Sequence, residues 1–71
     1  MRTIKEWRAA RGLSIRRLAE EAGVSHRTVY LADAGRQQPS VKLMWKIAAA
    51  LGTAPLEIAE FHKAITERGE E

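Results

Sequence analysis

Short segments separated by glycines are the dominant pattern of this chain. Four of its five glycines lie about one short helix apart, at Gly12, Gly23, Gly35 and Gly52. Glycine readily adopts the positive φ that ends an α-helix, so each of these positions predicts a helix end. Three serines stand where a following helix would begin and can cap it, namely Ser14, Ser25 and Ser40. Because the rest of the chain is rich in helix formers and has only two prolines, the pattern predicts an all-α fold.

The apolar residues within these segments repeat at intervals of three and four, which is the spacing of one helix face. We expect five helices, over residues 3–11, 15–22, 26–34, 41–51 and 55–67. Trp7, Trp45 and Phe61 lie at helical spacing, and we interpret them as core residues. A chain of 71 residues has room for one domain. We expect that domain to span residues 1–67, with residues 68–71 forming a frayed acidic tail.

The composition argues against several classes of function. The chain has no cysteine and its two histidines are far apart without carboxylates at ligand spacing, so we expect no metal site. It has no glycine-rich phosphate loop and no cluster of nucleophile, base and orienting group, so we expect neither a cofactor nor an enzyme. No apolar run approaches the roughly 18 residues of a membrane span. We therefore expect a cytoplasmic, nucleoid-associated protein without a membrane partner.

Charge is distributed unevenly along the chain. Residues 1–53 hold ten Lys or Arg against four Asp or Glu, a formal charge of +6, whereas residues 54–71 hold two against five, a charge of −3. A basic body favours a polyanionic partner, because Lys and Arg displace counterions from phosphates. An ordinary solvated surface is the alternative that charge alone leaves open.

Residues 14–35 carry the residue types that a tight pair of helices requires. Ala19 is small where the two helices would cross, Gly23 supplies the turn, and Val24 and Val29 would hold the pair to the core. Together with further matches in register, this segment resembles the helix-turn-helix of the Cro and C1 repressor family, also called the XRE family.

The resemblance extends from about Ile4 to Ile58. The matching residues are Arg8, Arg11 to Ser14, Leu18-Ala19, Ala22 to Ser25, Thr28-Val29, Asp33 to Gly35, Pro39-Ser40, Lys46 to Ala48 and Ala50 to Gly52. It implies a compact, lambda-repressor-like five-helix bundle that binds double-stranded DNA as a two-fold dimer. It also implies that Arg8 and Asp33 form a structural ion pair between the first and third helices.

The third helix of such a domain presents its first turn and outward side chains to base edges in the major groove. In this chain those residues are Ser25, His26, Arg27, Tyr30 and Leu31. Arg27 is the main candidate because a guanidinium can bond guanine bidentately, with a phosphate contact or a solvated side chain as the alternatives. Tyr30 and Leu31 are open to a second interpretation, in which they contact protein.

Phosphate contacts require less specific chemistry. The free amides at the start of the second helix lie beside Arg16 and Arg17, and a polar loop with Arg36 follows the third helix. The predicted phosphate-contacting residues are Arg16, Arg17, Thr28, Arg36, Gln37 and Gln38. The chain departs from the family at Ile15, where a glutamine usually bonds a phosphate.

Two functions are consistent with these residues. The first is a homodimeric regulator, a repressor or autoregulator of a palindromic operator, with a dimer surface predicted at Leu43, Ile58, Phe61 and Ile65. The second is a protein-interaction module, such as an antitoxin or polymerase-contacting factor, in which Ile15, Tyr30 and Leu31 grip a protein partner and DNA binding is secondary.

Overall fold

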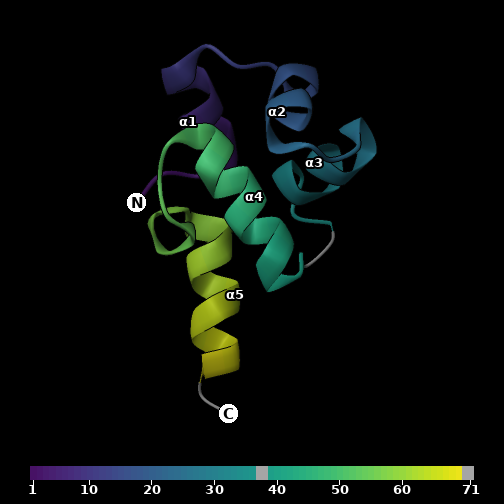
Figure 1. Ribbon diagram of the computed structural model, residues 1–71. Helices are drawn as coiled ribbons and strands as arrows, with labels where there is room; N and C mark the ends of the chain where they lie inside the picture. The colour runs from purple at the N-terminus through teal and green to yellow at the C-terminus, as the bar shows by residue number, and fades with distance from the viewer. Residues whose placement is uncertain (37–38, 70–71) are drawn as a thin grey trace.

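Five α-helices form the computed structural model, which describes residues 1–36 and 39–69 (Figure 1). They are α1 (Ile4–Arg11), α2 (Ile15–Ala22), α3 (His26–Asp33), α4 (Val41–Leu51) and α5 (Ala59–Gly69), with the short 3-10 helix η1 (Pro55–Glu57) before α5. Within these residues the only extended pairing is an isolated bridge between Arg2 and Ile58. The all-α, five-helix prediction is confirmed. No helix in the described ranges is long and apolar enough to cross a bilayer.

The predicted serine caps begin α2, α3 and α4. The hydroxyls of Ser14, Ser25 and Ser40 accept hydrogen bonds from the amides three residues later, at 3.0, 3.0 and 3.1 Å respectively. Each bond satisfies an amide that has no partner inside the helix. The start of α1 has a reciprocal capping box between Thr3 and Glu6, whose Thr-x-x-Glu signature the sequence prediction overlooked.

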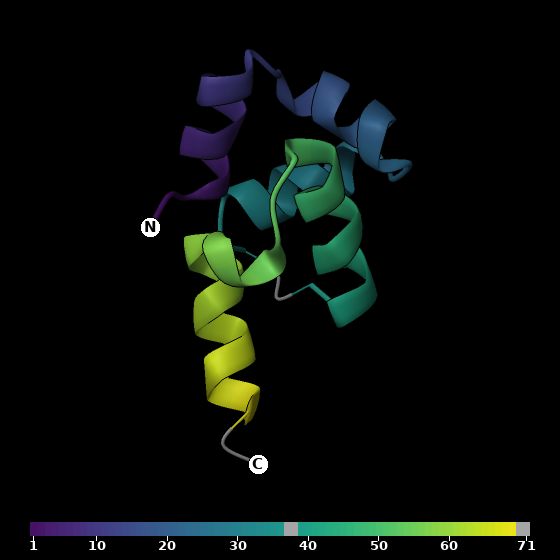
Figure 2. The ribbon, with the colours of Figure 1, turned by 60° about the vertical axis from the view of Figure 1, so that its left-hand side comes forward.

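The core lies around α4, which packs against α2, while α5 extends away from the other helices (Figures 1 and 2). Its fully buried side chains come from every helix, and the largest are Phe61, Ile4, Leu18, Met44, Ile47, Leu51, Ile58 and Val29. Burying each such side chain contributes roughly 1.5–3 kcal/mol. These contacts hold α2 and α3 in one orientation.

The fifth helix differs from its prediction. Residues 55–67 were expected to form one helix, but the backbone is extended at Ile58, with φ −103° and ψ 123°, so η1 and α5 are separate. The amide of Ala59 donates to the carbonyl of Arg2 at 2.8 Å, which replaces the helical bond that this break removes. The helix then continues to Gly69, two residues beyond the expected end. Residues 70 and 71 of the predicted tail lie outside the described ranges.

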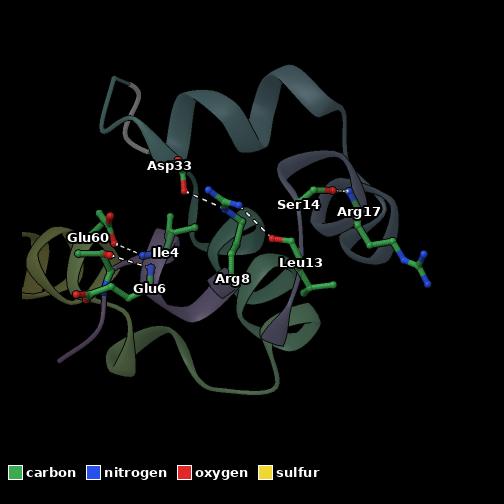
Figure 3. Close-up of polar contacts among 9 residues, drawn as sticks. Ile4, Glu6, Arg8, Leu13, Ser14, Arg17, Asp33 and Glu60 are labelled. Carbon is green, nitrogen blue, oxygen red and sulfur yellow. Dashed lines mark hydrogen bonds and ion pairs between the residues drawn. The ribbon is translucent and has the colours of Figure 1, made fainter. Parts of the chain in front are cut away.

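Hydrogen bonds connect the start of α1 to η1 and to the start of α5. Glu60 Oε1 accepts the amide of Ile4 at 2.9 Å (Figure 3). The indole nitrogen of Trp7 donates to the carbonyl of Glu57 at 3.2 Å. The guanidinium of Arg2 lies 5.2 Å from the centre of the Trp7 ring, within range of a cation–π contact. The N-terminal segment therefore fixes the end of α5 that is closest to the bundle, while the rest of α5 extends away from it (Figures 1 and 2).

The three aromatic residues predicted as core have different environments. Phe61 is completely buried and Trp7 packs partly buried against the core, but the core assignment of Trp45 is wrong, because its side chain is 58% exposed. The buried face of α4 is centred on Met44, Ile47, Ala48 and Leu51. Trp45 lies to one side of that face, about 100° around the helix from Met44.

Candidate nucleic-acid interface

A tight turn joins α2 to α3. Gly23 has a φ of +72°, and the amide of Val24 donates to the carbonyl of Ala19 at 3.0 Å, which closes the end of α2. A side chain at Gly23 would meet no neighbour, so the requirement for glycine arises from the backbone. Ala19 and Val29 are both buried where the two helices pack together. This is the geometry of a helix-turn-helix unit.

The outward face of α3 is defined by its buried face. Val29 and Ala32 point into the core. At about 100° per residue, Arg27 lies about 170° from the midpoint between these two side chains, nearly opposite the core. Tyr30 lies on one side of Arg27 and is 50% exposed, and Leu31 lies on the other side and is partly buried. The exposed His26 completes the start of this face.

Ser25 and Thr28 form a coupled pair of hydroxyls. Ser25 Oγ accepts the Thr28 amide at 3.0 Å and lies 2.6 Å from Thr28 Oγ1, with either oxygen able to donate. Each hydroxyl carries one proton, and their mutual bond uses one of the two. The pair therefore has a single O–H left for an external acceptor, so the base contact predicted for Ser25 and the phosphate contact predicted for Thr28 compete for one proton.

Exposed arginines lie at both ends of this unit. Arg16 and Arg17 are exposed in the first turn of α2, and Arg36 is exposed after α3. Arg17 Nε bonds Glu21 at 3.2 Å, but both side chains are well exposed and such a pair contributes little to stability. That contact uses one of the five guanidinium donors, so Arg17 can still reach a phosphate. Gln37 and Gln38, the other predicted phosphate contacts, lie outside the residues that the structure describes.

Arg8 connects α1 to both ends of the helix-turn-helix unit (Figure 3). Its Nε donates to Asp33 Oδ1 at 3.3 Å, and its Nη1 donates to the carbonyl of Leu13, before α2, at 3.1 Å. The two charged side chains are 15% and 14% exposed. Solvent therefore screens the attraction between them less than it would screen a pair on the surface. The structure thus brings Arg8 and Asp33 together, and one side chain fixes the end of α3 relative to α1 and α2.

The predicted dimer surface is not a continuous exposed surface. Ile58 and Phe61 are completely buried in the core of their own chain, which corrects their assignment to an interface. Apolar spacing over residues 55–67 indicated burial correctly, but these two side chains are buried in the core cluster of their own chain. Leu43 and Ile65 are partly buried and pack against the core. Ile15, proposed as a grip for a protein partner, also packs partly buried against the core.

The packed α2–turn–α3 unit, with Arg27 directed outward and arginines at both ends, defines a helix-turn-helix domain of the DNA-binding type. The model of the helix-turn-helix family HTH_3 matches residues 4–58. The chain belongs to this family.

Similar proteins support the assignment. An uncharacterized HTH-type transcriptional regulator of Methanothermobacter thermautotrophicus is 43% identical over 58 residues, which are 80% of this chain and 84% of that protein. The HTH-type transcriptional regulator SutR of Escherichia coli is 41% identical over 49 residues, which are 69% of this chain but 28% of SutR. This chain therefore corresponds to only a part of SutR.

Two solved structures have the same fold. The clp gene regulator ClgR from Corynebacterium glutamicum is similar over 94% of this chain and 72% of that one, with a TM-score of 0.73 and 25% identity. An HTH_3 family transcriptional regulator from Vibrio cholerae is similar over 86% of this chain and 33% of that one, with a TM-score of 0.68 and 30% identity. Because the family and these relatives are transcriptional regulators, the chain is a regulator-type helix-turn-helix domain and not an enzyme.

Proposed function

We propose that this chain binds a palindromic double-stranded operator as a homodimer and represses transcription, including that of its own gene. In this complex α3 lies in the major groove with Arg27 against a base edge. Arg16, Arg17 and Arg36 contact phosphates on either side. The two copies of α3 then lie about 34 Å apart, one helical turn of DNA.

The position of Arg27 is the observation that carries this proposal. Arg27 is exposed on the side of α3 opposite the core, and exposed arginines precede it in α2 and follow it after α3. Major-groove binding needs this combination of a specific donor at the centre and phosphate contacts on both sides. The competing protein-interaction function is less well supported, because Ile15, one of the three residues proposed to grip a partner, packs partly buried against the core and offers only part of its side chain.

Salt dependence tests DNA binding. We expect the association constant of the full chain for a mixed pool of duplexes to fall with salt, with a log–log slope of about −5 if the three arginines of each chain in the dimer neutralise phosphates. Fluorescence anisotropy between about 50 and about 200 mM salt measures the slope. Absent or salt-independent binding would contradict the proposal. Selection from a random duplex library then tests the dimer, since a site without two-fold symmetry would contradict a homodimer while leaving DNA binding intact.

The coupled hydroxyls give a second prediction. Because either Ser25 or Thr28 can supply the free proton, we expect Ser25→Gly and Thr28→Val each to change DNA affinity by no more than about twofold. The double variant should lose about 1 kcal/mol, or about fivefold. Glycine is the better replacement at Ser25, since it keeps most of the capping preference. Two single losses that add up to the double loss would mean that the hydroxyls make separate contacts.

A further inference from the structure

The outward face of α3 has Arg27 in its first turn and the apolar side chains of Tyr30 and Leu31 in its second. Arg27 and Tyr30 are exposed, and Leu31 is partly buried. Residues three and four apart on a helix are neighbours, with about 5–6 Å between their Cβ atoms, so these three side chains form one continuous surface. Phosphate contacts need charged or hydrogen-bonding groups, and they give no role to the apolar part of this surface.

Leu31 does not belong to the hydrophobic core. In the described part of the chain, four other leucines are either buried in the core or packed against it, namely Leu13, Leu18, Leu43 and Leu51. Leu31 and Leu56 are the two leucines outside this set. The packing of the core therefore does not account for a leucine at position 31.

An apolar side chain in the major groove has a specific partner, the C5-methyl group of thymine. The base 5-methylcytosine carries the same group, whereas cytosine and uracil lack it. Contacts to unmethylated cytosine or to adenine use a carboxylate or a side-chain amide. After its first turn α3 has neither Asn nor Gln, and its one carboxylate, Asp33, is bound by Arg8 and 14% exposed. The second turn of α3 therefore favours a methylated pyrimidine.

Leu31 is better suited to this contact than Tyr30. The tyrosine ring ends in a hydroxyl, which can donate to a phosphate oxygen. The leucine side chain is wholly apolar. Leu31 follows Arg27 by four residues, which is about 6 Å along the helix axis. Successive base pairs are about 3.4 Å apart, so the methyl group lies within about two base pairs of the guanine that Arg27 contacts.

We propose that Leu31 contacts the C5-methyl group of a pyrimidine within about two base pairs of that guanine. A leucine side chain has no hydrogen-bonding atom, so it does not distinguish the O4 carbonyl of thymine from the N4 amino group of 5-methylcytosine. Methylation of a cytosine at this position therefore strengthens binding, and the affinity of the domain depends on the methylation state of its DNA. This inference rests on the DNA binding of the proposed function and adds the chemistry of a second base.

Base analogues in the operator selected from the random library test the contact. In one half-site each thymine is replaced in turn by deoxyuridine, which removes only the methyl group. We expect one replacement to lower the affinity about fourfold, the effect of leaving one methyl group unburied. The same base pair is then changed to cytosine or 5-methylcytosine opposite guanine, and we expect the methylated base to bind about fourfold more tightly. Fluorescence anisotropy measures each affinity.

Leu31→Ala should remove both methyl effects and keep the preference for guanine at the Arg27 position. Leu56→Ala is the matched control, because Leu56 also lies outside the core but belongs to η1, and this variant should keep both methyl effects. Circular dichroism checks that each variant remains helical.

Three results would overturn this inference. One is equal affinity for thymine and deoxyuridine at every position. Another is a methyl effect that persists in Leu31→Ala, which would assign the methyl group to a different side chain. The third is a Leu31→Ala chain that binds every duplex as the unchanged chain does, which would make Leu31 a candidate for a protein contact. All three leave DNA binding itself intact, whereas a chain that selects no sequence from the library would contradict the proposed function as well.

Discussion

Replacement of Phe61 with alanine should lower the free energy of unfolding by about 3–5 kcal/mol. The ring is completely buried and is the largest such side chain in the described core, so its removal leaves a cavity between α5 and the bundle. Small domains have roughly 5–15 kcal/mol of stability in total, so this variant should be unfolded or close to it at moderate temperature. Urea denaturation followed by circular dichroism measures the change.

Ile65→Ala is the matched control for Phe61→Ala. Ile65 is on the same helix but only partly buried, so its removal should cost about 1 kcal/mol. The two variants also separate a core role from an interface role. If Phe61→Ala kept the stability of the unchanged chain and lost only dimerisation, Phe61 would lie between subunits, as its sequence pattern first suggested.

Replacement of Arg27 with alanine should abolish preference at one base pair of each half-site. A bidentate contact between arginine and guanine provides about 1–3 kcal/mol of discrimination, which is roughly 5- to 150-fold in affinity. The measurement compares binding to the selected operator with binding to its single-base variants. The loss should be confined to one position, because Arg27 is the side chain most nearly opposite the core and reaches one base edge.

Arg36→Ala is the comparison for Arg27→Ala. Arg36 lies after the end of α3, where it can approach the DNA backbone, so its removal should weaken binding evenly across operator variants. The salt slope should fall in magnitude by about two, one for each chain of the dimer. Equal effects of the two substitutions on base preference would show that the roles are assigned wrongly. An even loss for Arg27→Ala would make Arg27 a phosphate contact.

Most of the fold could be predicted because its boundaries depend on local signals. A serine hydroxyl bonds an amide three residues away, and a glycine ends a helix through its own φ, so neither requires knowledge of distant parts of the chain. The break at Ile58 is different. It depends on the pairing of Ala59 with Arg2, far along the chain, and nothing within residues 55–67 indicates it.

In the candidate site too, some residues could be predicted from local signals and others depend on distant parts of the chain. Alternation of buried and exposed residues on α3 gave the outward position of Arg27 from the sequence. Periodicity also indicated that Phe61 would be buried, but it could not say whether its own chain or a second copy buries it. The prediction that Trp45 is a core residue was wrong for a related reason. A large aromatic side chain beside the buried face of a helix is covered only if a neighbouring helix or loop reaches it. The Ser25–Thr28 pair had a local signal, two hydroxyl residues three positions apart at a helix start.

The mutual capping of α1 and α5 bears on how this domain is synthesised. Arg2 and Ile4 leave the ribosome long before Ala59 and Glu60, the residues with which they form hydrogen bonds across about 56 positions. The amide of Ile4 at the start of α1 therefore has no acceptor within the protein until nearly the entire chain has been synthesised. A nascent or truncated chain that stops before Ala59 also lacks Phe61. Such a fragment should contain the residues of α3 without holding them in place, so this domain is expected to fold in a single cooperative event.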